Sequence, residues 1–283
     1  MAEAQTRTSP ERLLEPVAAI AVDAGRAILE VYDREFEVTH KADHSPLTAA
    51  DLASHRLIRD ALARLTPGIP LLSEESAEIG FDIRSRWPEY WLVDPLDGTK
   101  EFVNRNGEFT VNIALIRGHD PVLGVVHVPV SGVTYTGVVG SGATRRSAGG
   151  AAGSVAAPIH VPIHVQVPCA DPVRVVGSRS HANPALARYL EPLGDYELVS
   201  MGSSLKFCLL AEGEADFYPR LGPTSEWDTA AAHAVVLAAG GRIVTLDGRP
   251  LQYNLKESFL NPEFLVIGDS ERDWLELFRG YDG

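Results

Sequence analysis

Cysteine is scarce in this sequence, which has two, Cys169 and Cys208, among 283 residues. A disulfide framework uses more, so the count favours free thiols and a cytoplasmic location, with a single pair as the alternative. Long apolar runs are also missing. No stretch approaches the roughly 20 residues of a membrane-spanning helix, and the opening MAEAQTRTSPER lacks the apolar core of a secretory signal. We therefore expect no integral membrane segment, whereas peripheral membrane association stays open.

Positive charge is in deficit, with 25 Lys and Arg against 38 Asp and Glu and a formal net charge of −13. A protein that follows a nucleic-acid backbone is usually basic, because its affinity comes from neutralising phosphates. The composition therefore argues against DNA or RNA as a partner. A small phosphorylated ligand is compatible with it, because bound divalent cations reverse the local charge. Ordinary solubility explains most of the acidic excess.

Apolar periodicity predicts the helices and strands of the chain. Ser9 as N-cap and Pro10 as the first helical residue predict a helix from residue 10. A second helix is expected from about Thr48 to about Leu65, and others at 184–190, 204–212, 229–239 and 271–278. Short β-branched runs bounded by Gly, Pro or Asp predict strands at 69–72, 90–93, 110–116, 122–128, 134–139, 174–176, 215–218, 242–245 and 264–267.

Residues 140–160 are poor in large apolar side chains and rich in Gly, Ala and Ser. This composition predicts a loop that connects two halves of the chain. The expected division is an α+β half over 1–140, a linker over 141–170 and an α/β half over 171–283. The fold class is therefore α/β in the broad sense, with an α+β part followed by an α/β part.

The strongest chemical signal is a turn that follows an apolar strand. The strand ends at Asp94, and Asp97 follows three residues later, with the Leu96 carbonyl between them. Three oxygens from one turn suit a hard cation such as Mg²⁺. The Gly98 amide and Thr99 hydroxyl come next, at an expected helix start where free N–H groups attract phosphate. The alternative is an Asx-turn with no metal.

Two further acidic elements lie far from this turn in the sequence. Glu74 and Glu75 are adjacent carboxylates at a strand end, where they repel each other unless a cation or water intervenes. The alternative is a solvated loop. Asp228 precedes an apolar helix and could direct its carboxylate to a metal. Its alternative role is that of a helix N-cap.

Taken together, the three acidic elements resemble the signature of the inositol monophosphatase superfamily, which comprises lithium-sensitive, Mg²⁺-dependent phosphatases. The matching elements occur in the family order as 74–76 (EES), 94–99 (DPLDGT) and 227–228 (WD). The resemblance covers roughly residues 11–270. It implies the layered α-β-α-β-α sandwich of the inositol monophosphatase and fructose bisphosphatase type, with metal ligands in 1–140 and with Asp228 and substrate contacts supplied by 171–283.

Other segments are similar to the 3′(2′),5′-bisphosphate nucleotidases within that superfamily. They are residues 45–51, 98–102, 106–113, 177–181 and 202–208. The sequence departs from the family at 140–168, where Gly142-Ala143-Thr144 lacks the usual aromatic residue and the link is longer. This departure concerns local geometry and interface contacts, including those of a possible homodimer, and leaves the metal motif intact.

The resemblance implies a role for each matching residue. Glu74, Asp94 and the Leu96 carbonyl would hold one Mg²⁺, and Asp94, Asp97 and Asp228 a second, in a site of two or three ions. Such ions would balance the repulsion among the carboxylates, bridge the phosphate and activate an in-line water without a phosphoenzyme.

A second set of implied roles concerns the water molecule. Thr99 and Asp51 would position the water, and Glu74 would also belong to the catalytic group. Glu75 would support these residues without contacting the ions itself. The alternative for Asp51 is a place in the first turn of a helix that begins in a capping-box-like Thr48-x-x-Asp51.

The nucleotide would occupy the second half of the site. By resemblance, His181, Ser203, Lys206 and Arg220 would contact the distal phosphate, ribose or base. Leu96, Asp97, Gly98, Thr99 and Asp228 would surround the phosphate that is removed. The alternatives are a helix cap at Ser203-Ser204 and a surface ion pair at Arg220. Cys208 and His233 lie at apolar helical spacing, which favours core positions for both.

The implied activity is hydrolysis of adenosine 3′,5′-bisphosphate to AMP and phosphate, in the context of sulfate assimilation. The related 3′-phosphoadenylyl sulfate is an expected second substrate. The metal motif does not separate this activity from inositol monophosphatase or fructose-1,6-bisphosphatase activity, whereas Lys206 and Arg220 favour the nucleotide. A non-catalytic sensor of phosphorylated ligands is the alternative from another class.

Overall fold

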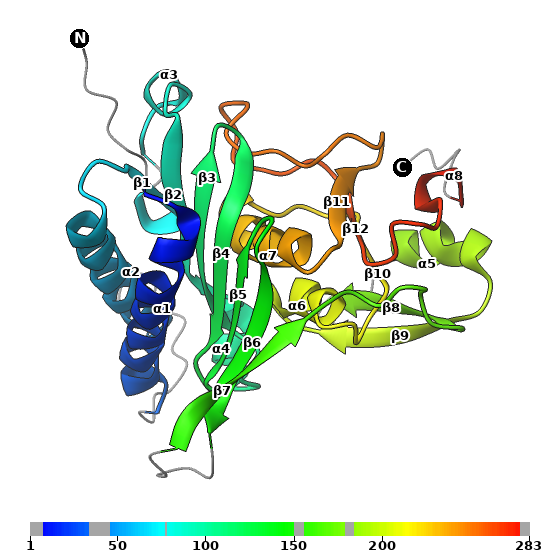
Figure 1. The fold of residues 1–283 in the computed structure, drawn as a ribbon, viewed down its shortest axis with the longest axis horizontal. Helices are drawn as coiled ribbons and strands as arrows, with labels where there is room; N and C mark the ends of the chain where they lie inside the picture. The colour runs from blue at the N-terminus through cyan, green and yellow to red at the C-terminus, as the bar shows by residue number, and fades with distance from the viewer. Residues whose placement is uncertain (1–7, 34–45, 77, 150–155, 179–183, 278–283) are drawn as a thin grey trace.

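The computed structural model describes residues 8–33, 46–76, 78–149, 156–178 and 184–277. Two β-sheets alternate with three layers of helices (Figure 1). The expected five-layer α-β-α-β-α arrangement is therefore confirmed. The helix predicted from residue 10 begins there as α1 (Pro10–Tyr32), although Ser9 makes no side-chain capping bond.

The first sheet has the order β1-β2-β3-β4-β5-β6-β7 within the described residues. Its first pair is parallel and the other neighbours are antiparallel. Strands that follow one another in the sequence thus pair side by side, and short connections join the antiparallel neighbours from β3 to β6. The strands are β1 (Leu71–Ser73), β2 (Glu89–Asp97), β3 (Thr110–Arg117), β4 (Asp120–Val128), β5 (Val133–Val138), β6 (Gly142–Gly149) and β7 (Ala156–Ile163).

The second sheet has the order β11-β12-β10-β8-β9. It is mixed: β8 is parallel to both of its neighbours, and β12 is antiparallel to both of its own. The strands are β8 (Val173–Ser178), β9 (Tyr196–Met201), β10 (Phe217–Arg220), β11 (Arg242–Thr245) and β12 (Phe264–Ile267). The order differs from the chain order, so helical crossovers connect the strands.

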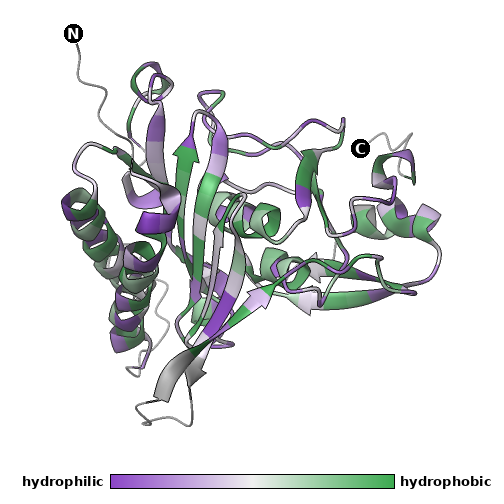
Figure 2. Ribbon diagram, in the orientation of Figure 1, coloured by the Kyte–Doolittle hydropathy of each residue, from purple (hydrophilic) through white to green (hydrophobic). Residues whose placement is uncertain are grey.

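Six helices form the three helical layers among the described residues. α1 and α2 (Pro46–Leu65) cover the outer face of the first sheet, α6 (Leu205–Ala211) and α7 (Glu226–Ala238) lie between the sheets, and α5 (Pro184–Leu190) and α8 (Trp274–Leu277) cover the far side. Shorter pieces are η1 (Glu74–Ser76), α3 (Phe81–Arg84), α4 (Thr99–Val103) and η2 (Glu191–Leu193). Figure 2 shows that α7 is apolar, as its position between two sheets requires.

The alanine-rich sequence of α7 permits a very close approach to the first sheet. A Cβ atom on Gly124 of β4 would lie 2.0 Å from the Ala231 carbonyl oxygen, and one on Gly137 of β5 would lie 2.8 Å from the Val235 Cα. Small residues on both sides therefore set the distance between α7 and the sheet. The same helix carries Asp228 in its first turn.

The loop predicted over 140–160 is wrong. β6 and β7 occupy most of that segment and pair with each other in antiparallel register. β6 lacks large apolar side chains, and the apolar Ile159 and Val161 of β7 are 54% and 46% exposed, because β7 is the edge of the sheet. Strand β9 was also not predicted. The division of the chain at 141–170 stays a prediction.

Two absences expected from the sequence can be compared with the structure. Both Cys169 and Cys208 are free thiols, which confirms that they do not pair. Within the described ranges, no helix combines the length and apolarity needed to cross a membrane.

Candidate active site

The turn that follows the apolar part of β2 has the expected shape. The pairing of β2 with β3 shifts register between Asp94 and Asp97, which makes room for the turn. The Leu96 amide donates to Asp94 Oδ1 at 3.0 Å, and Asp94 is only 1% exposed. Gly98 then adopts a φ of +93°, and α4 begins at Thr99. The left-handed backbone at Gly98 is one that glycine adopts without strain.

One face of α2 contacts both acidic segments. The Ser54 hydroxyl donates to the Pro95 carbonyl at 2.8 Å, and His55 Nδ1 lies 3.0 Å from the Ser73 hydroxyl, next to Glu74. Asp51 lies three and four residues earlier, so it shares this face. Its Oδ1 atom is buried and has no hydrogen-bond partner among the described residues. The helix face therefore presents an uncompensated carboxylate oxygen beside both segments.

The capping-box alternative for Asp51 is wrong. α2 begins at Pro46, so Thr48 lies inside the helix and cannot be its N-cap. The preceding proline fixes φ and starts the helix two residues earlier than the Thr48 signal suggested.

Asp228 lies in the first turn of α7, where it is not the N-cap. The helix starts at Glu226, three residues before the predicted start, with Ser225 as the N-cap. Ser225 and Asp228 form a capping box in which the Ser225 amide donates to Asp228 Oδ2 at 2.8 Å. The second carboxylate oxygen stays available for another partner.

The acidic side chains raise one another's pKa values. Burial and then Asp97, Glu74, Asp228 and Asp51 hold the pKa of Asp94 well above its usual range. Burial raises the pKa of Asp228 to about 7, with Asp97 as the next cause. The pKa of Asp51 rises to about 8, through burial first and then the charges of Glu75 and Glu74.

The remaining two carboxylates follow the same trend. Burial raises the pKa of Asp97, and burial followed by the charge of Glu75 raises the pKa of Glu74, although the Glu74 residue as a whole is exposed. Carboxylates that disfavour one another's ionisation are the donor set that a hard divalent cation prefers. In the side-chain positions described, no three His, Cys, Asp or Glu residues converge as a finished ion-binding group. The carboxylates are therefore electrostatic neighbours that a cation would draw together.

Asp97 is held by residues that the sequence analysis did not single out. The Ser204 amide donates to Asp97 Oδ2 at 2.6 Å, and the Thr110 hydroxyl lies 3.4 Å from the same atom. The Ser204 hydroxyl in turn lies 2.8 Å from Thr110 Oγ1 and donates to Asn112 Oδ1 at 2.9 Å. Polar Thr110 and Asn112 in an otherwise apolar buried strand were the available signal.

A cavity of about 90 Å³ lies beside these carboxylates. It brings together five of the residues selected from the sequence: Asp97, Ser203, Lys206, Arg220 and Asp228. The lining is completed by Ser204, Phe207, Tyr218, Thr224 and Thr229. Ser203 adopts a φ of +41°, a backbone conformation that non-glycine residues seldom adopt and that often marks functional sites.

One selected residue, His181, lies outside the described residues. The helix-cap alternative at Ser203 and Ser204 is confirmed in position for Ser204. Ser204 stands at the N-cap position of α6, but it makes no side-chain capping bond.

Two cations face the cavity from the second sheet's side. Lys206 is buried, and its pKa falls to about 8 because of burial, which the charge of Asp97 partly opposes. Its Nζ lies 3.5 Å from the Met201 carbonyl. Arg220 donates to the Pro223 carbonyl at 2.7 Å, while its buried Nε has no hydrogen-bond partner among the described residues. A buried lysine and a half-buried arginine beside an open space form a natural anion site.

The core positions expected for two residues are confirmed. Cys208 is 1% exposed and belongs to a hydrophobic cluster with Phe207 and Leu210. His233 is 2% exposed, and its Nδ1 lies 2.8 Å from the Tyr253 hydroxyl. Burial lowers the pKa of His233 to about 3, so it stays neutral.

The fold and the acidic cluster agree with comparisons against known proteins. A model of the inositol monophosphatase family matches residues 9–277. The chain therefore belongs to the inositol monophosphatase family, whose enzymes depend on metal ions, typically Mg²⁺.

Similar proteins narrow the comparison to one branch of this family. The chain is 52% identical over 256 residues to the 3′(2′),5′-bisphosphate nucleotidase CysQ of Escherichia coli K12, which spans 90% of this chain and 99% of the relative. It is 36% identical over 273 residues to the CysQ of Haemophilus influenzae, with 96% and 98% covered. Among solved structures, CysQ of Bacteroides thetaiotaomicron matches with a TM-score of 0.78 and 42% identity over 89% of this chain and 96% of that chain.

Proposed function

We propose that the chain is a 3′(2′),5′-bisphosphate nucleotidase that converts adenosine 3′,5′-bisphosphate to AMP and phosphate. The observation that carries the proposal is the position of Lys206 and Arg220 in one cavity with Asp97 and Asp228. A bisphosphate needs both a cation-binding carboxylate cluster for one phosphate and fixed positive charge for the other. The CysQ relatives, which carry this activity in their names, support the same assignment.

Five positions would hold the metal ions. Glu74, Asp94 and the Leu96 carbonyl would hold one Mg²⁺, and Asp94, Asp97 and Asp228 a second, in a site of two or three ions. When bound, the ions would polarise the phosphate and lower the pKa of a bound water. The raised pKa values of the carboxylates support this assignment, because positive charge would relieve their repulsion.

Asp51 and Thr99 would position the attacking water. The Thr99 hydroxyl, at the start of α4, would accept a hydrogen bond from the water and donate its own proton toward Asp51. The buried Asp51 Oδ1 is free to accept it. A carboxylate whose pKa is raised toward neutrality is a suitable proton acceptor. Glu74 would complete this catalytic group from the metal side.

The other end of the nucleotide would lie along the second half of the chain. Lys206 and Arg220 would bind the distal phosphate, and Ser203 and His181 would contact the phosphate, ribose or base. The amide of Gly98 would face the phosphate that is removed. The sulfated analogue, 3′-phosphoadenylyl sulfate, differs only at the distal group and would be a second substrate.

A phosphate-release panel tests the proposed function. It compares adenosine 3′,5′-bisphosphate, 3′-phosphoadenylyl sulfate, inositol 1-phosphate and fructose 1,6-bisphosphate in the presence of Mg²⁺. The adenosine bisphosphate should give the highest kcat/KM. Inositol 1-phosphate has no second phosphate for Lys206 and Arg220, and the names of the CysQ relatives favour a nucleotide over a sugar bisphosphate. A higher kcat/KM for inositol 1-phosphate or fructose 1,6-bisphosphate would assign the corresponding phosphatase activity to the chain. No phosphate release from any of the four compounds would favour a non-catalytic sensor of phosphorylated ligands.

Replacing Lys206 by methionine tests its role at the distal phosphate. Lys206→Met keeps the length and apolar stem of the buried side chain and removes its charge. We expect KM for the adenosine bisphosphate to rise on the order of tenfold to a hundredfold, the loss typical of a charge-assisted hydrogen bond. KM for 2′-AMP, which lacks the second phosphate, should change far less. Equal increases for both substrates would refute a distal-phosphate role.

Two other expectations stay predictions, the cytoplasmic location and the homodimer. Neither is needed for the proposed chemistry, because the cavity and the carboxylate cluster are formed within one chain.

A further inference from the structure

Three buried polar atoms outside the candidate active site share an unusual property. Arg84 Nε, Tyr90 OH and Glu226 Oε2 have no hydrogen-bond partner among the described residues. The three residues are 1%, 0% and 3% exposed and come from α3, β2 and α7. A buried polar group without a partner is costly, so each of these atoms requires one.

The three groups are close neighbours in the interior. After burial, the charge of Glu226 is the main influence that raises the pKa of Tyr90, and Arg84 lowers it. Asn254 joins the other two groups directly. Its amide donates to Glu226 Oε1 at 2.9 Å, and its Nδ2 donates to the Arg84 carbonyl at 2.7 Å. Arg84 Nη1 in turn donates to Asn254 Oδ1.

The chemistry of the three atoms is complementary to one water molecule. The Arg84 Nε–H only donates, Glu226 Oε2 accepts when the carboxyl is ionised, and the Tyr90 hydroxyl does both. Among the described residues Arg84 and Glu226 make no direct ion pair with each other. A water that accepts from Arg84, donates to Glu226 and bonds to Tyr90 makes the three hydrogen bonds typical of buried water. A metal cation is disfavoured there by the guanidinium charge.

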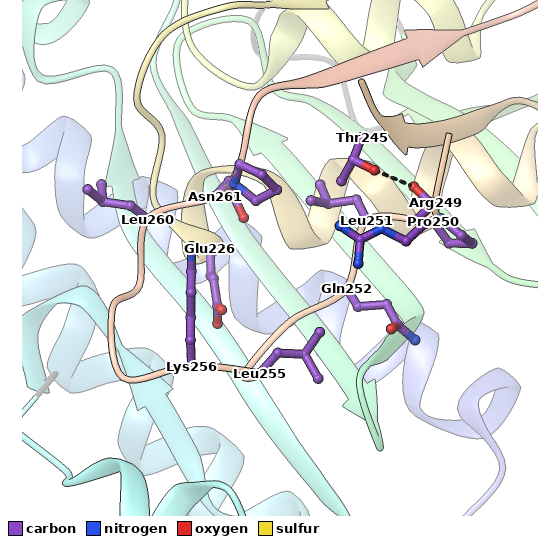
Figure 3. A pocket seen from close by; sticks show the side chains of 11 residues that line it. Glu226, Thr245, Arg249, Pro250, Leu251, Gln252, Leu255, Lys256, Leu260 and Asn261 are labelled. Carbon is purple, nitrogen blue, oxygen red and sulfur yellow. Dashed lines mark hydrogen bonds between the residues drawn. The ribbon is translucent and has the colours of Figure 1, made fainter. Parts of the chain in front are cut away.

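A nearby cavity gives this region a connection to solvent. Glu226 is among the residues that line a cavity of about 400 Å³, together with Leu251, Leu255 and Leu260. Figure 3 shows the Glu226 side chain extending away from Asn261 and toward the segment that carries Leu255. Glu226 is therefore the member of the three that reaches the lining of this cavity.

Arg84 also fixes the segment that covers the start of α7. Its Nη2 donates to the Lys256 carbonyl at 3.0 Å and to the Glu257 carbonyl at 2.5 Å. Two residues further on, the Phe259 carbonyl accepts from the Glu226 amide at 2.8 Å. The Arg84 guanidinium also stacks on this segment, with its carbon atom 4.2 Å from the Phe259 ring centroid. Arg84, this segment and the first turn of α7 thus form one connected unit.

We propose that Arg84, Tyr90 and Glu226 hold a bound water that fixes the first turn of α7 against β2. β2 carries Asp94, and the first turn of α7 carries Asp228. The bridge therefore positions the two carboxylates relative to each other, although none of its members belongs to the cavity beside them. The inference rests on the proposed function only in taking Asp94 and Asp228 as metal ligands.

A high-resolution crystal structure of the full chain tests the water directly. It should show an ordered water within hydrogen-bond distance of all three atoms, Arg84 Nε, Tyr90 OH and Glu226 Oε2. A site without such a water, or a direct Arg84–Glu226 ion pair in its place, would overturn the proposal.

Mg²⁺ affinity, measured by titration calorimetry without nucleotide, tests the positioning role. Tyr90→Phe removes one partner of the water, and Glu226→Gln replaces its acceptor Oε2 by an NH₂ donor. Each should weaken Mg²⁺ binding about tenfold, as loss of an outer partner typically does. The control Glu257→Gln removes an exposed charge near Arg84 and should leave the affinity within about twofold. Unchanged affinity in the well-folded Tyr90→Phe variant would overturn the role. If the substrate assignment were wrong, the phosphate-release panel would reveal it. The Mg²⁺ affinities, which are measured without nucleotide, would not change.

Discussion

Asp94→Asn is expected to lower kcat by more than about a hundredfold and, at the same time, to raise the melting temperature of the metal-free protein. Under the proposed metal assignment the activity would fall because a buried carboxylate that would be shared by two ions becomes neutral, a larger change than loss of an outer partner. The stability rises because Asn keeps the acceptor for the Leu96 amide and relieves the repulsion from Asp97 and Glu74. The measurements are phosphate release with excess Mg²⁺ and calorimetric melting in EDTA.

The combination of the two effects separates a metal ligand from a structural residue. A structural role would lower both activity and melting temperature, because removal of a needed group destabilises the fold. The matched control is Asp195→Asn, which makes the same change on the exposed surface and should alter neither quantity appreciably. Near-normal turnover in Asp94→Asn would remove Asp94 from the metal site.

The metal-free protein should lose stability as the pH rises from about 6.5 to about 8. The lower limit is the reference pKa of histidine, and the upper limit is the pKa of Asp51. A carboxyl whose folded pKa exceeds its unfolded value of about 3.9 binds its proton more tightly in the folded state. It therefore contributes stability at low pH, which is lost as the pH rises through the folded pKa. For Asp228 and Asp51 the folded pKa values are about 7 and about 8.

The other buried groups define the useful pH range. Burial lowers the pKa of His127 to about 4 and of His233 to about 3, so their opposite contribution acts below about 6.5. The pKa of Lys206 is about 8, so this residue changes the stability only between that pH and the ordinary lysine pKa of 10.5. Glu226, with a pKa of about 7, adds to the carboxylate trend.

Melting temperatures across this range, in EDTA and in excess Mg²⁺, check the prediction. Because Mg²⁺ binds only deprotonated ligands, the stabilisation that it gives should increase with pH over the same interval. Asp51→Asn should flatten the EDTA curve near its upper end, since it removes the group with the higher pKa. A metal-free melting temperature that is independent of pH, or that rises with it, would contradict the electrostatic picture of the site.

The parts of the site that could be predicted from the sequence are local. Asp94, Asp97 and Gly98 lie within one turn, and the residue types alone specify an apolar strand, a sharp bend and a helix start. Apolar periodicity identified most of the strands and the longer helices for the same reason. That the charges of Glu74 and Asp228 influence Asp94 in this turn could be expected only from the family resemblance, because no local pattern connects residues so far apart.

The parts that could not be predicted depend on long-range contacts. Ser204 supports Asp97 from a turn 107 residues later in the chain, and no local pattern in 202–208 predicts that contact. The β6–β7 hairpin was missed because edge strands are held by backbone pairing and need little apolar side-chain area. The helix starts at Pro46 and Glu226 were misplaced because stronger signals lay a few residues downstream, an ordinary uncertainty of helix boundaries.

The tight seating of α7 on Gly124 and Gly137 links the interior of the molecule to its chemistry. A single added methyl group at either glycine would meet backbone atoms of the helix, so the helix would have to move outward. Asp228 lies in the first turn of α7 and would be displaced together with the helix. Substitutions at these two glycines would therefore be limited by the position that Asp228 has to keep. If Asp228 binds an ion as proposed, a packing defect in the middle of the sheet would weaken ion binding.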